Sequence, residues 1–245
     1  MNVYKRYLRG CFSSNLLGAI EFTIATDSML ESVTSLNTEI SMTINFLGKD
    51  ILGQLGCLGI VSKIGKYSDK SPTNFFKNTF YLQQACVLTE SLTWIIPAFS
   101  NFHGSSALFF LTAGIANIGK NVSFINFGAI NAKCIPKIKQ KMRDDLLEEN
   151  CSKGLDVTNV LNEQLILDDS EQNNSSEGMD VGEIYSKVNV VSTLGSSIGM
   201  MLGLGIIYTI PSPALRSCLI PALALMKYYT LEYTFKGLYE TEKYT

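Results

Sequence analysis

The sequence predicts an all-α protein: a helical bundle that is embedded in part in a membrane and carries a disordered acidic insert. Only 17% of the residues are charged, against about 25% in soluble domains, and the mean hydropathy is +0.16. Apolar residues recur at three- and four-residue spacings, and no series of alternating strands is present. Residues 188–215 are uncharged, and 20 of them in a helix would span about 30 Å, the thickness of a bilayer core.

The composition also excludes several classes of function. The net charge of −2 removes the basic excess that nucleic-acid binding requires, so no nucleic-acid partner is expected. The cysteines are far apart and form no CxxC pair, so neither a zinc module nor a small disulfide scaffold is indicated. We expect reduced, mostly buried thiols at Cys11, Cys57, Cys86, Cys134, Cys151 and Cys218.

The first segments of the chain combine basic and apolar residues. Lys5, Arg6 and Arg9 precede an apolar run at residues 11–20, a pattern that a signal peptide would share. Residues 27–47 follow the helical period, and Asp27 is the predicted N-cap of that helix.

Residues 49–69 bear Gly53, Gly56 and Gly59 at every third position. On a helix this spacing makes an oblique strip of small residues that suits close packing. Asp50 stands at the head of the strip, next to Lys49.

A further helix is predicted from residue 78, and Pro97 should kink or end it because proline lacks an amide donor and clashes with the preceding turn. Residues 107–132 are apolar apart from Lys120. A lone lysine at the centre of a bilayer is costly, so this segment is predicted to be buried in protein or interfacial.

The composition then changes sharply. Residues 133–143 contain five basic residues and no acid, whereas residues 144–183 contain twelve acids and one lysine. We therefore predict one domain over residues 1–245, with a solvated, disordered insert at residues 144–182.

The glycine-rich stretch at residues 193–208 has two interpretations. It lacks GxGxxG and GxxxxGK[ST], so a phosphate-binding loop is disfavoured. On a helix, Gly195, Gly199 and Gly203 share one face, which lets another helix approach closely, as happens in membranes. A buried helix of a soluble bundle is the alternative.

The end of the chain is predicted from its prolines and tyrosines. Pro211 and Pro213 should end the preceding helix near residue 210. The last segment, from Arg216, begins apolar and becomes rich in tyrosine and mixed charge, as helices that enter a membrane interface do.

No catalytic constellation is visible. The single histidine, His103, lies in a predicted turn, and nothing in the pattern brings a nucleophile to it. Glu183 and Lys187 have the i,i+4 spacing of a helix ion pair. We expect no enzymatic activity, no metal and no cofactor.

Three stretches occur in an order typical of one family. They are "CFSSNLLGAIEFTIA", "INFLGKDILGQLGCLGIVSKIGKYSDKSPTNFFKN" and "DVGEIYSKVNVVSTLGSSIGMMLGLGI". This arrangement resembles the root UVB-sensitive family, as a divergent or shortened member. The family's Trp-Arg pair corresponds here to Phe76-Lys77, and its charged Ala-Asp-x-x-Asn-Asp stretch is uncharged.

The resemblance assigns specific positions to the family's motifs. Those positions are Asp50, Gly53, Gly56, Glu183, Lys187, Gly195, Gly199 and Gly203. It implies a helical, membrane-associated protein linked to vitamin B6 homeostasis and to UV-B-dependent seedling development, with family members acting together as homo- or hetero-oligomers. It implies no reaction. It also implies that the N-terminus is the first helix of the domain. The alternative function is a carrier of a B6 vitamer-like small molecule, with Asp50 and Lys187 facing an internal cavity.

Overall fold

The chain folds into an elongated bundle of helices. The computed structural model describes residues 2–34, 47–56, 58, 72–99, 105–152 and 181–239, and these residues contain no β-strand. The elements are α1 (Asn2–Thr34), α3 (Pro72–Ser91), the 3₁₀ helix η1 (Thr93–Phe99), α4 (Ser105–Ser152), α6 (Val181–Thr209) and α7 (Pro213–Tyr239). Residues 47–56 form an additional short helical segment. The predicted all-α class is confirmed.

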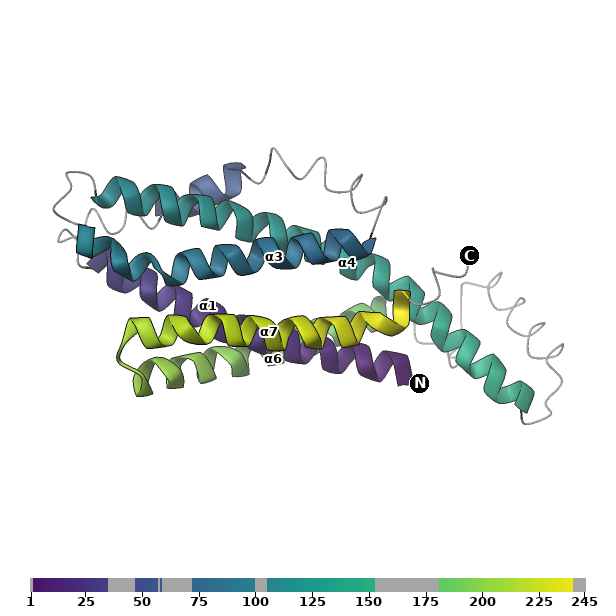
Figure 1. Cartoon of the computed structure of the whole chain (residues 1–245). Helices are drawn as coiled ribbons and strands as arrows, with labels where there is room; N and C mark the ends of the chain where they lie inside the picture. Colours follow the sequence, from purple (N-terminus) through teal and green to yellow (C-terminus); the bar gives the residue numbers. More distant parts are fainter. Residues whose placement is uncertain are drawn as a thin grey trace.

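Helix α1 is the centre of the bundle (Figure 1). It contacts α3, η1, α4, α6 and α7, and most closely α6 and α7. The helices α1, α3 and α6 run in one direction, and α4 and α7 run in the other. Every long helix therefore has an antiparallel neighbour, and the same two ends of the bundle are shared by all of them.

Two predicted boundaries were wrong. Asp27 does not cap a helix, because α1 runs without interruption through it to Thr34. The acidic insert was predicted to begin at Asp144, but α4 continues to Ser152. The rest of the insert, residues 153–180, lies outside the described residues, as do His103 and Gly59.

Of the two predicted stops at proline, the one before Pro211 is confirmed. Helix α3 ends at Ser91 and is followed by η1, which contains Pro97. Helix α6 ends at Thr209, directly before Ile210 and Pro211. The fixed φ angle and missing amide donor of proline account for the stop at Thr209, whereas α3 ends six residues before Pro97.

Three buried clusters follow one another along the bundle. The first is rich in aromatic rings and includes Tyr7, Phe76, Phe80 and Phe235, with Phe76 and Phe235 centred 5.0 Å apart. A second, aliphatic cluster surrounds Ile24 at mid-length. The third contains Met29, Val33, Ile96, Phe109 and Ala113.

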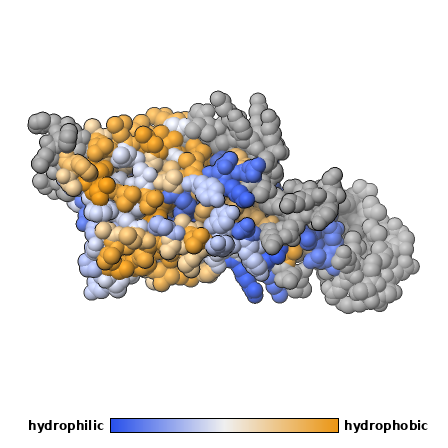
Figure 2. All heavy atoms as spheres, in the orientation of Figure 1, coloured by the Kyte–Doolittle hydropathy of each residue, from blue (hydrophilic) through white to orange (hydrophobic). Residues whose placement is uncertain are grey.

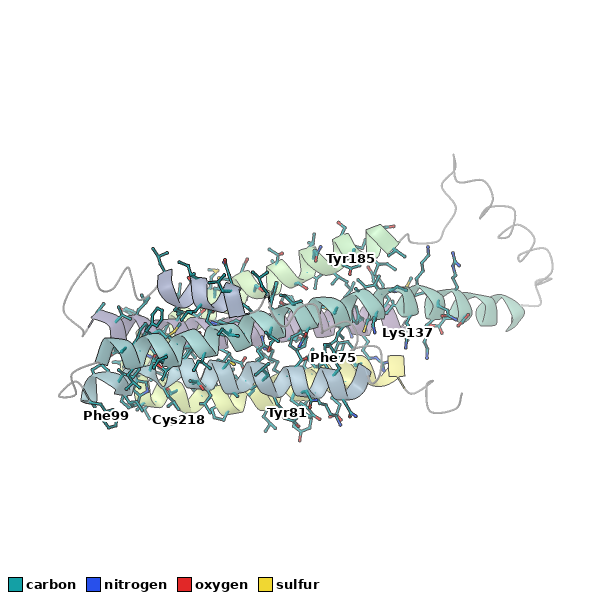
Figure 3. All side chains as sticks on the ribbon, turned by 90° about the horizontal axis from the view of Figure 1, so that it is seen from above. Phe75, Tyr81, Phe99, Lys137, Tyr185 and Cys218 are labelled. Carbon is teal, nitrogen blue, oxygen red and sulfur yellow. The ribbon has the colours of Figure 1, made fainter. Side chains whose placement is uncertain are left out.

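The basic residues gather at the end of the bundle that holds the aromatic cluster. We call this the basic end; its members include Lys5, Arg6, Arg9, Lys77, Lys133, Lys137, Lys139, Lys141, Arg143 and Lys187. Figure 3 shows Lys137 and Tyr185 towards this end, and Phe99 and Cys218 towards the other. In Figure 2 the rest of the visible face is mostly apolar. We call the length of the bundle outside the basic end the apolar part.

Two of the described helices are long and apolar enough to cross a membrane, by length and composition. They are residues Ala107–Asp145 of α4 and Val181–Thr209 of α6. In α6 only 17% of the most apolar stretch is buried within the chain, so most of that stretch faces outwards. Its exposed side chains are Val190, Leu194, Ile198, Met200, Met201, Leu202, Leu204 and Tyr208.

Candidate functional site

The apolar part of the bundle contains a set of buried charges. Glu21 of α1 and Lys227 of α7 are at its centre, with Nζ of Lys227 3.4 Å from Oε2 of Glu21. Neighbouring amides of α3 complete the cluster: Lys227 donates to Oε1 of Gln83 at 3.1 Å, and Gln84 donates to Oε2 of Glu21 at 3.2 Å. Three helices therefore meet at one buried ion pair.

A second ion pair lies close to the first. Nζ of Lys120, on α4, lies 2.7 Å from Oε2 of Glu90, on α3, and the Glu90 side chain is fully buried. The lysine was predicted to be buried in protein or interfacial, and the structure shows it mostly buried. The ring of Phe22 joins the two pairs, because the ammonium nitrogens of Lys120 and Lys227 lie over it at 4.9 and 5.9 Å from its centroid.

The predicted residue Asp50 takes part in a third pair. Its Oδ1 accepts from Lys49 Nζ at 2.9 Å and from Asn117 Nδ2 at 3.1 Å. Asn117 also donates to the Lys49 carbonyl at 3.1 Å, which fixes the segment 47–56 against α4. Gly53 and Gly56 lie on the same contact, facing Asn117 and Ile118.

Arg216 is the fourth cation of the apolar part. Its Nη1 donates to the carbonyls of Ile210 and Pro211 at 3.0 and 3.2 Å, so it closes the turn between α6 and α7. Its Nη2 lies 2.6 Å from Oδ2 of Asp27 and 3.2 Å from Oε2 of Glu31. Four cations are described in the apolar part, and each has a carboxylate partner. The cations are Lys49, Lys120, Arg216 and Lys227.

Some buried acceptors in this cluster have no hydrogen-bond donor among the described residues. They are Oε1 of Glu21, Oε1 of Gln84 and Oε1 of Glu90. A buried acceptor without a donor is costly, so each can accept a hydrogen bond from a water or from a donor group of a ligand, and the two glutamate oxygens can also take a proton. The cluster is suited to binding a proton or a polar group inside an apolar protein.

The glycines of α6 pack against α1. Gly195, Gly199 and Gly203 are buried, and the face that they form is the one predicted from their spacing. A Cβ on Gly195 would lie 2.5 Å from the carbonyl oxygen of Phe12, and one on Gly199 would clash with that of Leu16. The glycines thus bring two backbones of the same chain together.

The remaining predicted residues lie elsewhere. Glu183 and Lys187 form the expected i,i+4 pair at 2.7 Å, but both side chains are about half exposed at the basic end. Among the described residues, Lys187 pairs with Glu183 and Asp50 with Lys49 and Asn117, so the two predicted residues lie in separate contacts. The free thiols of Cys11, Cys86 and Cys134 are buried, as expected, whereas Cys218 is exposed. Cys57 lies outside the described residues.

The sequence reasoning missed Glu21, Glu90 and Lys227. A signal was present, because each is a single charge within an otherwise apolar helical stretch. Such charges are uncommon in membrane helices and mark functional positions there. Their partners could not be read from the sequence, since Glu21 and Lys227 are 206 positions apart.

Comparisons with protein-family models, curated proteins and solved structures give no match to this chain. The resemblance to the root UVB-sensitive family therefore rests on the sequence stretches alone.

Proposed function

We propose that this chain is an integral membrane protein of the root UVB-sensitive type that acts by binding and protein association, without catalysing a reaction. The observation that carries the proposal is the distribution of polarity. The cations described in the apolar part are mostly buried and each is paired with a carboxylate, while large apolar side chains cover the outside. A soluble protein rarely exposes an apolar surface of this extent. A bilayer accommodates it, and the resemblance adds the link to vitamin B6 homeostasis.

Alkaline carbonate extraction of membranes from expressing cells tests the membrane assignment. An integral protein stays in the pellet, because alkaline pH removes peripheral proteins but leaves buried apolar helices in the lipid. A matched peripheral protein should move to the supernatant in the same sample. Complete release of this chain into the supernatant would contradict the proposal.

The association proposed here cannot use the glycine face of α6, because α1 of the same chain occupies it. The opposite face of α6 is exposed and includes Leu194, Met201 and Leu204. A second copy of the chain, or a related family member, is the proposed partner on that face. Light scattering of the detergent-solubilised protein should give the mass of more than one chain, and Met201→Lys should reduce it to one.

A second candidate function is a carrier for a B6 vitamer-like molecule, and the buried cluster favours it. Charged groups inside membrane helices commonly line substrate or ion pathways. Here Glu21, Glu90, Lys120 and Lys227 lie together, with acceptor atoms free to bind a donor. Pyridoxine or pyridoxal phosphate titrated into purified protein should give a saturable calorimetric signal. Glu21→Gln should weaken it, whereas Glu183→Gln, at the exposed pair, should not; a flat titration would exclude this candidate.

A further inference from the structure

A groove lies between α1 and α7 at the basic end, outside the buried cluster. It has a volume of about 370 Å³. Helix α1 contributes Arg6, Arg9, Gly10 and Ser13, which share one helix face, and α7 contributes Tyr229, Thr230, Tyr233 and Thr234. Gly10 and Thr234 are buried and face each other so closely that a Cβ on Gly10 would overlap the Thr234 side chain. They form the floor, and the other residues form the walls.

The groove is positively charged and its arginines are available. The guanidinium of Arg6 lies 5.5 Å from the ring centroid of Tyr233, which holds it beside α7 without neutralising it. Among the described residues, neither Arg6 nor Arg9 has a carboxylate or hydrogen-bond partner, and Nε of Arg6 is buried without an acceptor. This differs from the apolar part, where every described cation is paired.

The polar atoms of the groove are mostly donors. The hydroxyls of Thr230 and Thr234 already donate to backbone carbonyls, of Met226 at 2.8 Å and of Thr230 at 2.6 Å. The two guanidinium groups, together with the hydroxyls of Ser13, Tyr229 and Tyr233, are left to donate to a ligand. Guanidinium groups bind phosphate oxygens through paired, charge-assisted hydrogen bonds. A phosphate group is the ligand chemistry that this donor set matches.

The surroundings of the groove indicate where the phosphate comes from. One turn along α7, towards the apolar part, Leu225 and Met226 are more than half exposed. Tyr229 and Tyr233 are also mostly exposed, and tyrosine is enriched where membrane proteins meet lipid headgroups. A ligand in the groove is thus bordered by apolar surface on the side of the bilayer. This arrangement suits a molecule with a phosphate head and apolar chains.

We propose that this groove binds the phosphate of an anionic phospholipid. Arg6 and Arg9 bind the headgroup, Ser13 and the tyrosine hydroxyls orient it, and the acyl chains lie along Leu225 and Met226. The inference rests on the proposed membrane embedding. Basic pockets between helices at a membrane surface bind anionic headgroups in this way.

Native mass spectrometry of the full-length, detergent-solubilised protein tests the site. The protein is mixed with equal amounts of phosphatidylglycerol and phosphatidylcholine, and one phosphatidylglycerol should be retained preferentially. The double variant R6Q/R9Q should bind it about tenfold more weakly, since it removes the charge-assisted hydrogen bonds. Lys5→Gln is the matched control, because it removes a neighbouring charge that does not line the groove; it should retain the lipid.

Further arms keep the outcomes distinct. Ser13→Phe should also abolish retention with both arginines present, which covers the case that R6Q/R9Q does not fold. Equal loss in Lys5→Gln and R6Q/R9Q would overturn the site. Displacement of the lipid by millimolar inorganic phosphate would overturn the lipid assignment and leave a soluble phosphate ligand. Lack of lipid preference in a protein that resists carbonate extraction would overturn this inference alone, whereas release by carbonate would overturn the membrane proposal.

Discussion

The ammonium nitrogen of Lys227 lies 3.4 Å from Oε2 of Glu21, and both side chains are almost completely buried. The two residues are 206 positions apart, so the contact joins the first and last described helices. The pair can form only when α1 and α7 are packed against each other in the folded bundle.

Removing one partner of this ion pair should destabilise the protein strongly. Lys227→Met leaves the Glu21 carboxylate buried without a counter-charge, which costs about 3–5 kcal/mol. Glu21→Gln should also lower the midpoint of thermal unfolding in detergent. The double variant E21Q/K227M removes both charges, so it should be more stable than Lys227→Met alone. Simple addition of the two losses would show that the residues do not interact.

Two glycines of α6 should respond to alanine in opposite directions. Gly199→Ala places a methyl group against the carbonyl of Leu16, and such overpacking costs about 1–3 kcal/mol. Gly205→Ala meets nothing within 4 Å and replaces glycine in a helix, so it should stabilise by up to about 1 kcal/mol. Thermal unfolding of both variants in detergent measures the difference. Equal effects would mean that α1 and α6 are not in backbone contact.

The stability of the protein should depend on the guanidinium geometry of Arg216 as well as on its positive charge. Its guanidinium bonds two carbonyls of the α6–α7 turn and pairs with Asp27 and Glu31 at the same time. A lysine ammonium cannot reach all four groups in this planar arrangement. Arg216→Lys should therefore destabilise the protein by about 1–3 kcal/mol. Lys5→Gln, at an exposed position, should leave the unfolding midpoint unchanged, and a wild-type midpoint for Arg216→Lys would refute the role.

The basic end should face the cytosol. Loops and helix ends rich in lysine and arginine stay on that side of a membrane, and the α6–α7 turn at the other end contains no charge between Ile210 and Pro213. In a background without other cysteines, Ser212→Cys should react with an impermeant maleimide on intact cells or vesicles. Lys139→Cys should react only after permeabilisation. Labelling in the reverse order would invert the orientation.

Local sequence patterns were sufficient to predict several features of the fold. The face of Gly195, Gly199 and Gly203 and the Glu183–Lys187 pair depend on spacing within one helix, and both are present. The stop after Thr209 depends on neighbouring prolines. The lone charge of Lys120 in an apolar run predicted that its segment is buried in protein or interfacial, and its side chain is mostly buried. Each of these features is decided within a few residues of sequence.

Features that depend on a distant partner were not predicted. Asp27 precedes an apolar periodic run, which is the pattern of an N-cap. In the structure it lies inside the continuous helix α1, and its carboxylate pairs with Arg216. Asp50 and Lys187 were expected to face one cavity. In the structure Asp50 accepts from Asn117 of α4, whereas Lys187 pairs with Glu183 of α6. A one-dimensional pattern identifies a charge in an apolar helix, and only the fold shows which residue pairs with it.

The ring of Phe22 lies beneath both Lys120 and Lys227. Because one π-system attracts both ammonium groups, the ring is a contact that the two lysines share. The pairs Glu21–Lys227 and Glu90–Lys120 are contributed by four helices, α1, α3, α4 and α7. One aromatic side chain of α1 therefore ties four helices together at a single point inside the bundle.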